Sequence, residues 1–440
     1  MAVDTNRRPI NARILRRWLT PGIGIKRWLA LGLLGIGLIA LAIAIIPQSS
    51  LDADHPLSDA GPLHILLSLT AGVFLVAVAL YKFTDKLITP YRRLQQGHLI
   101  DVVYAHNKRH KGLKVVAIGG GTGLPSVLRG LKQQTSNITA IVTVADDGGS
   151  SGRLRRETGA LPPGDLRNNI AALADDENLM TRLFQYRFDR GDLGGHAFGN
   201  LFITALAGVS GGIESALTEI ERVLNVQGRV LPSTLEDVRL LATVVPPGKS
   251  RGIKIQGESR ITEIGGSIEQ IGITPENAAA YPGSVHAILE ADLVVIGPGS
   301  LYTSILPNLL VRGIADALRA TSAYKVYICN VATQPGETEG YTVADHVLAL
   351  ERHVGRGVFQ LVLANNAFPT ENAGENTHYV QPVPANHEIS QRYEIRYLDL
   401  TDRQQPWRHD PQKLAEVILQ LHEFEKSGGD LKDSAVANRV

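Results

Sequence analysis

Residues 114–134 read KVVAIGGGTGLPSVLRGLKQQ, and this stretch decides the fold. Its first residues predict a buried parallel strand, and a helix begins near Pro125 with Leu128 and Leu131 on one face. The glycines between them can expose backbone N–H groups beside the positive end of a helix dipole, which favours an anion. The stretch alone is also compatible with a simple tight turn from strand to helix.

The glycine loop supplies the first candidate binding residues: Gly120, Gly121, Thr122 and Gly123. Thr122 adds a hydroxyl donor to the backbone amides. The loop is no Walker A motif, because no Gly-Lys-Ser/Thr sequence ends it, and Ser126 occupies the last glycine position of GxGxxG. NTP hydrolysis is therefore disfavoured.

A second predicted strand, ITAIVTVA at 138–145, ends in Asp146 and Asp147. Nucleotide-binding α/β units place the acid that accepts from a ribose hydroxyl at about this position. The polar stretch that follows, DDGGSSGRLRRETGALPPGDLRNNIAAL, is typical of a binding loop. The two acids could hold Mg²⁺ beside a diphosphate. The diphosphate could be neutralised by an arginine, although a solvated surface charge explains each one equally well: Arg153, Arg155, Arg156 or Arg167.

Two further blocks carry candidate ligands. HAFGNLFITALAGV at 196–209 puts His196 and Asn200 on one face if the helix begins that early, with a ligand contact or a helix cap as the alternatives. ADLVVIGPGSLYTSILPNLLV at 291–311 is a second buried strand, and it enters a helix through a second glycine loop containing Gly297, Gly299 and Ser300. Because open α/β sheets bind ligands at the carboxyl ends of their strands, the two glycine loops can face one crevice.

The remaining blocks complete the α/β pattern. Residues 230–279 predict an insertion that contains a hairpin, and strands are expected at 325–332 and 358–366. A late helix should begin with Asp410 as its N-cap and Pro411 at the first helical position. Cys329 should pack as a small buried residue.

Composition narrows the function classes. The 440 residues carry 44 Lys plus Arg against 43 Asp plus Glu, so a formal charge of +1 supplies no field that attracts nucleic acid. A single cysteine excludes an internal disulfide framework and any CxxC motif. Aromatic residues make up 5% of the chain, which is unlike a protein that stacks single strands on aromatic side chains. We therefore expect no nucleic-acid partner.

The first hundred residues predict a membrane anchor of two helices at 28–46 and 62–81. Arginine and lysine precede the first run and follow the second, whereas aspartates lie between them, which places both ends and the rest of the chain in the cytoplasm. A cleaved signal peptide is the alternative for the first run. The expected organisation is a basic cytoplasmic arm, a multi-pass hairpin, a juxtamembrane linker, an α/β domain and a polar tail, at 1–27, 28–81, 82–112, 113–423 and 424–440.

Several long blocks in this order carry a resemblance to a known family: GGGTGLPSVLRGLK, TVADDGGSSGRLR, PPGDLRNN, FQYRF, HAFGN, GPGSLYTSILPNLLV and CNVATQPGETEGY. Over residues 114–421 the chain closely resembles the gluconeogenesis factor (YvcK) family of bacteria. That family is similar in fold to the 2-phospho-L-lactate transferases. The resemblance implies a Rossmann-like, mostly parallel sheet with helices on both faces.

The resemblance also implies binding of UDP-N-acetylglucosamine or a related UDP-sugar, and support of cell-wall synthesis and cell shape during gluconeogenic growth. Carried onto this chain, the binding residues are Gly120, Gly121, Thr122, Gly123, Asp146, Asp147, Asn169, His196, Asn200, Gly297, Gly299, Ser300 and Arg408. We expect a regulatory binding protein without a catalytic residue, a homo-oligomer, and an enzyme of wall or amino-sugar metabolism as partner. The alternative is a Mg²⁺-dependent transferase that acts on a nucleotide-activated substrate.

Overall fold

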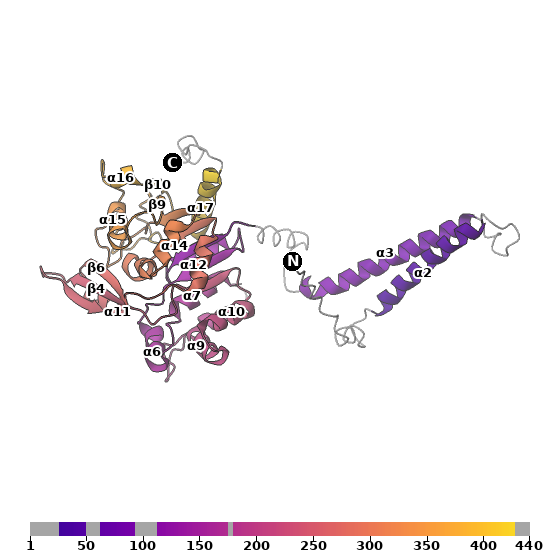
Figure 1. Ribbon diagram of the computed structural model, residues 1–440, viewed down its shortest axis with the longest axis horizontal. Helices are drawn as coiled ribbons and strands as arrows, with labels where there is room; N and C mark the ends of the chain where they lie inside the picture. Colours follow the sequence, from indigo (N-terminus) through magenta and orange to yellow (C-terminus); the bar gives the residue numbers. More distant parts are fainter. Residues whose placement is uncertain (1–25, 50–61, 93–111, 175–178, 427–440) are drawn as a thin grey trace, which may run out of the picture. The chain divides into compact units, whose positions relative to one another are not determined.

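The buried aliphatic runs form one sheet in the computed structural model, which describes residues 26–49, 62–92, 112–174 and 179–426 (Figure 1). Seven strands lie in the order β10-β9-β8-β7-β1-β2-β3, and each neighbouring pair is parallel. Their bounds are β1 Val115–Gly119, β2 Ile138–Val142, β3 Arg229–Pro232, β7 Leu293–Ile296, β8 Tyr324–Ile328, β9 Leu361–Asn365 and β10 Glu394–Leu398. The predicted α/β sheet is confirmed.

Helices cover both faces of the sheet because the strand residues alternate between two hydrophobic cores. Val115 and Ala117 of β1 pack with α5, α7 and α17, whereas Val116 and Ile118 pack in the core that includes α14 and α15. The helices of the α/β domain are α5 Leu124–Leu131, α6 Gly149–Thr158, α7 Gly164–Leu173, α8 Leu179–Gln185, α9 Phe198–Ser210, α10 Ile213–Val223, α11 Glu258–Ile264, α12 Pro282–Leu289, the π-helix η1 Leu301–Ile305, α13 Leu306–Leu310, α14 Ile314–Ala320, α15 Val343–Val354, α16 Ile389–Arg392 and α17 Pro411–Lys426.

The strand order reverses at β1. Strands β2 and β3 lie on one side of it, and β7, β8, β9 and β10 lie on the other. The crevice between β1 and β7 is therefore a topological switch point, where open α/β sheets bind their ligands. Both predicted glycine loops follow these two strands.

Most of the insertion predicted at 230–279 is a separate antiparallel sheet in the order β5-β4-β6. Its first residues, 230–232, were wrongly included, because they belong to β3, which pairs with β2 in the main sheet. The strands of the antiparallel sheet are β4 Arg239–Val245, β5 Ile253–Gln256 and β6 Ser267–Thr274. Leu240, Ala242 and Val244 of β4 alternate inward and join the same core as α14 and α15. This packing places α11, which lies between β5 and β6 in the chain, beside the aspartates that follow β2.

Some element boundaries differ from the prediction. Strand β10 was not predicted, because its sequence EIRYL alternates charged and apolar residues at a partly exposed sheet edge. Helix α9 begins at Phe198, so His196 precedes it and does not share a helix face with Asn200. The predicted cap of α17 is confirmed, since Asp410 Oδ1 accepts from Gln412 N at 2.8 Å and from Lys413 N at 3.0 Å.

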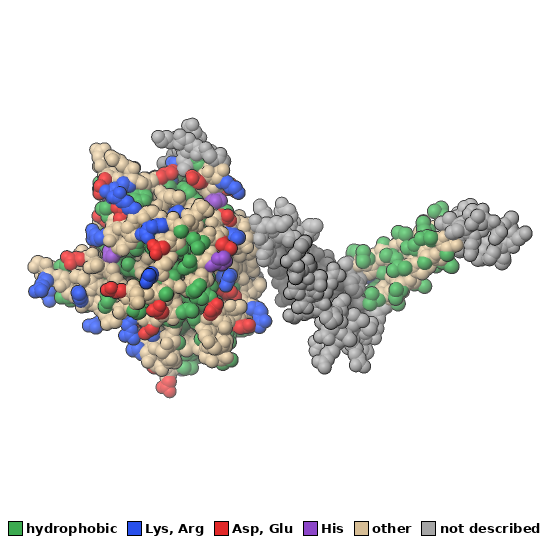
Figure 2. Space-filling model, viewed as in Figure 1, with side chains coloured by type: hydrophobic (Ala, Val, Ile, Leu, Met, Phe, Trp, Pro, Cys, Tyr) green, Lys and Arg blue, Asp and Glu red, His purple; other side chains and the backbone are tan. Residues whose placement is uncertain are grey.

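The chain divides into two compact units, Met1–Ala105 and His106–Val440. In the first, α2 Lys26–Ser49 packs antiparallel on α3 Pro62–Arg92, because a Cβ on Gly35 would lie 2.8 Å from Gly72 O and a Cβ on Gly32 would lie 3.5 Å from Ala79 Cβ. Hydrophobic side chains cover the visible face of the described part of these helices (Figure 2). Helix α3 extends past Tyr81 into the predicted linker.

The helical hairpin meets only part of the membrane prediction. Within the described residues, Arg27–Ala44 is long and apolar enough to cross a bilayer, whereas the apolar stretch Leu66–Lys82 is shorter. The second span and the topology therefore remain predictions. The predicted basic arm up to residue 25, the loop at 50–61, residues 93–111 of the linker and the tail from 427 lie outside the described residues.

Candidate functional site

A cavity of about 490 Å³ opens at the carboxyl edge of the sheet, at the switch point. This volume is within the range of small-molecule sites, roughly 300–1,000 Å³. Its wall is formed by the segments that follow β1, β7 and β8, by residues of α7 and α8, and by residues 407–409. Six of the predicted site residues line it: Gly121, Thr122, Gly123, Gly299, Ser300 and Arg408.

Neighbouring atoms leave no space for a Cβ at two positions of the first glycine loop, Gly121 and Gly123. A Cβ on Gly121 would lie 2.2 Å from Asp165 Oδ1, and one on Gly123 would lie 2.4 Å from Pro298 O in the second loop. Neither glycine has a positive φ. Gly121 N–H donates to the Asp165 carboxylate, so this amide already has a partner within the protein.

Gly120 and Asn169 support the loop from behind the cavity wall. Asn169 Nδ2 donates to Gly120 O at 3.1 Å and to Asp165 O at 2.8 Å. A Cβ on Gly120 would lie 2.5 Å from Ser304 Oγ, which leaves no room for any side chain. Both were predicted to contact the ligand, and the structure places them one layer back.

The second loop owes its shape to two glycines with positive φ, Gly297 at 81° and Gly299 at 157°. Asn330, directly after β8, fixes Gly299 from both sides: its Nδ2 donates to Gly299 O at 2.9 Å, and its Oδ1 accepts from Gly299 N at 3.1 Å. Ser300 caps η1 by accepting from Thr303 N at 3.2 Å, and its hydroxyl donates to Glu337. Hydrogen bonds therefore hold the loop at both Gly299 and Ser300.

Positive charge dominates the rest of the wall. Four arginines line the cavity and no carboxylate does: Arg129, Arg167, Arg187 and Arg408. Arg167 is 9% exposed, and its Nε is buried without a hydrogen-bond partner. Burial, and secondarily the Arg187 charge, lowers the pKa of Arg167. Its Nη2 donates to Asn168 Oδ1 at 2.7 Å, so the guanidinium is only partly satisfied. A buried guanidinium with an unpaired Nε beside a second arginine favours an anionic ligand.

Acidic side chains gather behind the glycine loop rather than on the cavity wall. Burial, and secondarily the Asp146 charge, raises the pKa of Asp165 to about 7. Burial also raises the pKa of Asp146, of Glu337 and, strongly, of Glu258, on which the charges of Asp165 and Asp146 act too. Such mutually destabilising carboxylates are common at functional sites.

The aspartates after β2 are held by the backbone. Asp146 Oδ1 accepts from Gly148 N at 2.8 Å, and Asp147 Oδ1 accepts from Ser259 N of α11 at 3.0 Å. Neither lines the cavity. In the described part of the chain, no three His, Cys, Asp or Glu side chains are arranged to hold a metal ion. The Mg²⁺ role of the two acids therefore stays a prediction.

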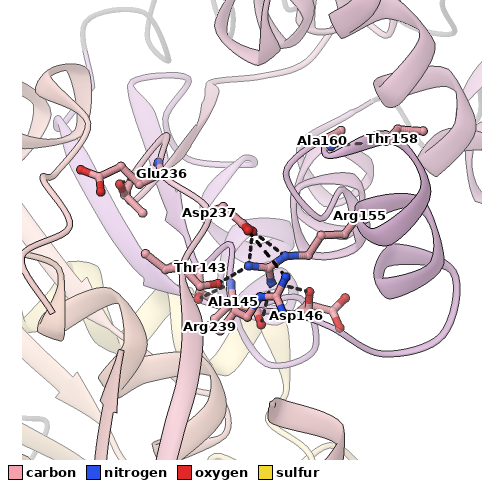
Figure 3. Close-up of polar contacts among 11 residues, drawn as sticks. Thr143, Ala145, Asp146, Arg155, Thr158, Ala160, Glu236, Asp237 and Arg239 are labelled. Carbon is pink, nitrogen blue, oxygen red and sulfur yellow. Dashed lines mark hydrogen bonds and ion pairs between the residues drawn. The ribbon is translucent and has the colours of Figure 1, made fainter. Parts of the chain in front are cut away.

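Arg155 holds the backbone of Asp146 and the side chain of Asp237 (Figure 3). Its side chain is 4% exposed, and its Nε donates to Asp237 Oδ1 at 2.7 Å. Nη1 donates to Asp146 O at 3.3 Å, and Nη2 donates to Val238 O. A single guanidinium thus joins the loop after β2 to the segment that precedes β4, and Arg155 acts as a structural clamp rather than as a ligand-facing charge.

His196 and Asn200 form a buried network instead of contacting the cavity. Ser150 Oγ bonds to His196 Nδ1 at 3.0 Å, and Asn200 Nδ2 donates to the same hydroxyl at 3.0 Å. Burial and the Arg153 charge lower the pKa of His196. Of the other predicted arginines, Arg153 donates to Gly194 O at 2.8 Å and Arg156 is exposed. Their ligand roles remain predictions.

Several residues of the cavity wall were not predicted from the sequence. Trp407, Gln334, Asn330, Arg129 and Arg187 line the wall. All but Trp407 fall within a block that carries the family resemblance, but no spacing rule links positions so far apart in the chain. The glycine loops were recognisable because their signal is contiguous.

Comparisons with known proteins agree with this architecture. The family model of 2-phospho-L-lactate transferase CofD matches residues 115–417. The Gluconeogenesis factor of Bacillus subtilis is 46% identical over 314 residues, which cover 70% of this chain and 98% of that protein. A relative from Nostoc sp. is 46% identical over 429 residues and covers 92% of each chain.

A solved structure extends the agreement to three dimensions. The crystal structure of a UPF0052 family member from Bacillus halodurans is similar with a TM-score of 0.66 at 41% identity, and it covers 70% of this chain and 100% of that chain. The match covers almost the whole length of the B. subtilis protein and of the B. halodurans chain. The chain therefore belongs to the gluconeogenesis factor (UPF0052) family, whose domain is related to the CofD model.

Proposed function

We propose that the α/β domain binds a UDP-sugar, with UDP-N-acetylglucosamine as the first candidate, and acts as a regulatory protein of cell-wall precursor synthesis. The observation that carries the proposal is the cavity wall, which combines two glycine loops with four arginines and has no carboxylate. A diphosphate is the group that such a wall favours, because arginine forms paired, charge-assisted hydrogen bonds to phosphate oxygens.

The diphosphate is expected beside Thr122 and Gly123 on one side and Gly299 and Ser300 on the other. Arg167 would then find the partner that its buried Nε lacks. The cysteine, Cys329, offers no thiolate nucleophile to this site, since it is fully buried and burial raises its pKa to about 12. Binding without turnover is the simplest function for this site.

We further propose that α2 and α3 anchor the domain at the cytoplasmic face of the cell membrane. The support is the exposure of their apolar side chains, such as Leu33 at 69% and Phe74 at 67%. The anchor would hold the binding domain close to membrane-bound wall synthesis. Fractionation of cells that carry a C-terminal reporter should recover it in membranes with the reporter inside, and a soluble or exported product would contradict the anchor.

Melting temperatures of the fragment 106–440 against a ligand panel test the binding proposal. UDP-N-acetylglucosamine at a hundred times its Kd should add about 2.7 kcal/mol to the free energy of unfolding, whereas NAD should add none. Thr122→Ala should reduce the shift by about 1 kcal/mol or more, because one hydrogen bond to charged phosphate is lost. A panel without any UDP-sugar response would contradict the proposal.

A transferase is the second candidate, favoured by the match to the 2-phospho-L-lactate transferase model over residues 115–417. The carboxylates behind the glycine loop, Asp146, Asp165 and Glu258, supply acidic groups for such chemistry. Mass spectrometry of UDP-N-acetylglucosamine incubated with the protein, Mg²⁺ and cell extract distinguishes the two. Unchanged ligand is expected for a binding protein, and a new product that requires the protein would favour the transferase.

A further inference from the structure

We infer that the base of the nucleotide lies at the β8 end of the cavity, stacked on Trp407 and paired along its edge with the carboxamide of Gln334. This inference rests on the proposed function and assigns the two residues that give it specificity for a nucleotide. The diphosphate loops occupy the β1 and β7 end, so the ligand would extend across three neighbouring strand ends.

Trp407 is a preformed aromatic surface. It is the one tryptophan, tyrosine or phenylalanine on the cavity wall, and 39% of it is exposed. None of the ring contacts in the described chain involves it. A large aromatic ring left partly open beside arginines is suited to stacking with a planar base, since every base has a π-face.

The loop that carries Trp407 is held firmly. Asp402 Oδ1 accepts from Gln404 N and Gln405 N, each at 2.8 Å, and Asp402 N donates to Arg408 O at 2.9 Å. The next residue, His409, is buried, and its ring bonds to Cys329 O at 3.2 Å, directly after β8. These bonds hold the chain on both sides of Trp407 at the β8 end of the cavity.

Gln334 carries a carboxamide oxygen without a hydrogen-bond partner at the same end. It lies five residues after Cys329 and lines the cavity, and its Oε1 is buried without a hydrogen-bond partner. Its backbone is fully engaged: the amide donates to Thr338 Oγ1 at 2.9 Å, and the carbonyl accepts from Thr338 N at 3.0 Å. Because buried polar groups are normally paired, the free side chain points to a ligand group that satisfies it.

The chemistry of uracil matches this pair of residues. Its N3–H donor lies beside carbonyl acceptors, and a carboxamide offers one acceptor and a donor group in the same plane. Stacking supplies affinity for any base, whereas edge pairing favours a base over a second phosphate or a sugar. Arg129, Arg167 and Arg187 remain available for the diphosphate.

The test uses the fragment 106–440, in which Trp407 is the sole tryptophan because the other two are Trp18 and Trp28. The fragment should fold alone, since its unit is compact and the B. subtilis and B. halodurans relatives consist almost wholly of this part. Saturable quenching of Trp407 emission by UDP is expected, without quenching by N-acetylglucosamine 1-phosphate or pyrophosphate.

Calorimetric titration with UDP then measures the Kd of each variant. Trp407→Ala should weaken binding about tenfold or more, Trp407→Phe should retain most affinity, and Gln334→Leu should weaken it several-fold. The matched control is Gln404→Leu, which makes the same change at an exposed position off the cavity wall and should leave Kd unchanged. Melting temperatures verify that each variant is folded.

Two results distinguish a failure of the base-site inference from a failure of the proposed function. If the wild-type fragment binds UDP and Trp407→Ala binds it within about twofold, or if sugar phosphate quenches Trp407 and UDP does not, this inference is overturned and the proposed function survives. If neither UDP nor UDP-N-acetylglucosamine binds the wild-type fragment, both are overturned.

Discussion

Asp165→Asn should make the fragment 106–440 more stable by about 4 kcal/mol at about pH 8, the largest gain that we expect from a single substitution. The wild-type carboxyl is buried behind the glycine loop, and burial raises its pKa to about 7 from an ordinary value of 3.8. At the higher pH the folded protein must hold a desolvated charge beside Asp146. Asparagine keeps the shape and the acceptor for Gly121 N–H without that charge.

The sign of the pH dependence follows from the raised pKa. Protonated Asp165 stabilises the fold fully below the ordinary pKa of 3.8, and this contribution is lost as the pH rises through about 7. The advantage of the asparagine variant should therefore shrink to below about 1 kcal/mol near pH 4, because the other titrating groups are shared by both proteins.

Urea unfolding at several pH values measures this difference. Asp192→Asn is the control, because Asp192 is exposed and its substitution should leave stability unchanged across the same range. A variant that is no more stable than wild type at the higher pH would contradict the prediction. It would show that the buried charge of Asp165 does not lower the free energy of unfolding. The predicted gain instead indicates a carboxyl kept for function at the expense of stability.

Arg155→Met should destabilise the domain by about 2–4 kcal/mol and weaken UDP-sugar binding as well. The substitution removes the donors for Asp146 O and Val238 O, and the contact to Val238 O is buried. The loop after β2 then loses its link to the segment that precedes β4. Urea unfolding and calorimetric titration measure the two effects on the same protein.

Arg239, which lies in the same group of polar contacts, provides the matched control (Figure 3). Arg239 also pairs with Asp237, with Nη2 3.8 Å from Oδ2, but its side chain is 51% exposed. Arg239→Met should change the free energy of unfolding by less than about 1 kcal/mol, as is usual for an exposed ion pair. Equal losses in the two variants would mean that the charge of Asp237, rather than the backbone contacts of Arg155, governs stability here.

The parts of the fold that could be predicted from the sequence are each encoded in one short, continuous stretch of residues. A buried strand, a glycine loop and a helix occur within twenty residues in the unit that begins at Lys114, and the unit that begins at Ala291 has the same order. Since parallel strands end at one edge of a sheet, the meeting of the two loops could be foreseen. The cap at Asp410 is similarly local.

The parts that were missed depend on contacts between distant segments. Asp165 contacts Gly121 although the two lie 44 residues apart in the sequence, and Arg155 donates to Asp237 although these lie 82 residues apart. His196 and Asn200 were expected to face a ligand, but Ser150 takes both as hydrogen-bond partners. No periodicity encodes such pairings, so the sequence pattern marked these residues as polar and close to the site without indicating which way each side chain points.

Titration of UDP-N-acetylglucosamine into the fragment 106–440 and into its Arg167→Met variant tests the binding site most directly. Arg167 lines the cavity with a buried, unpaired Nε, whereas Arg156 is exposed and off the wall, so Arg156→Met is the control. We predict saturable binding by wild type and by the control, and a loss of about tenfold or more for Arg167→Met, because a charge-assisted contact to phosphate is removed. Equal affinity in all three proteins, or no binding by wild type, would contradict a diphosphate site in this cavity.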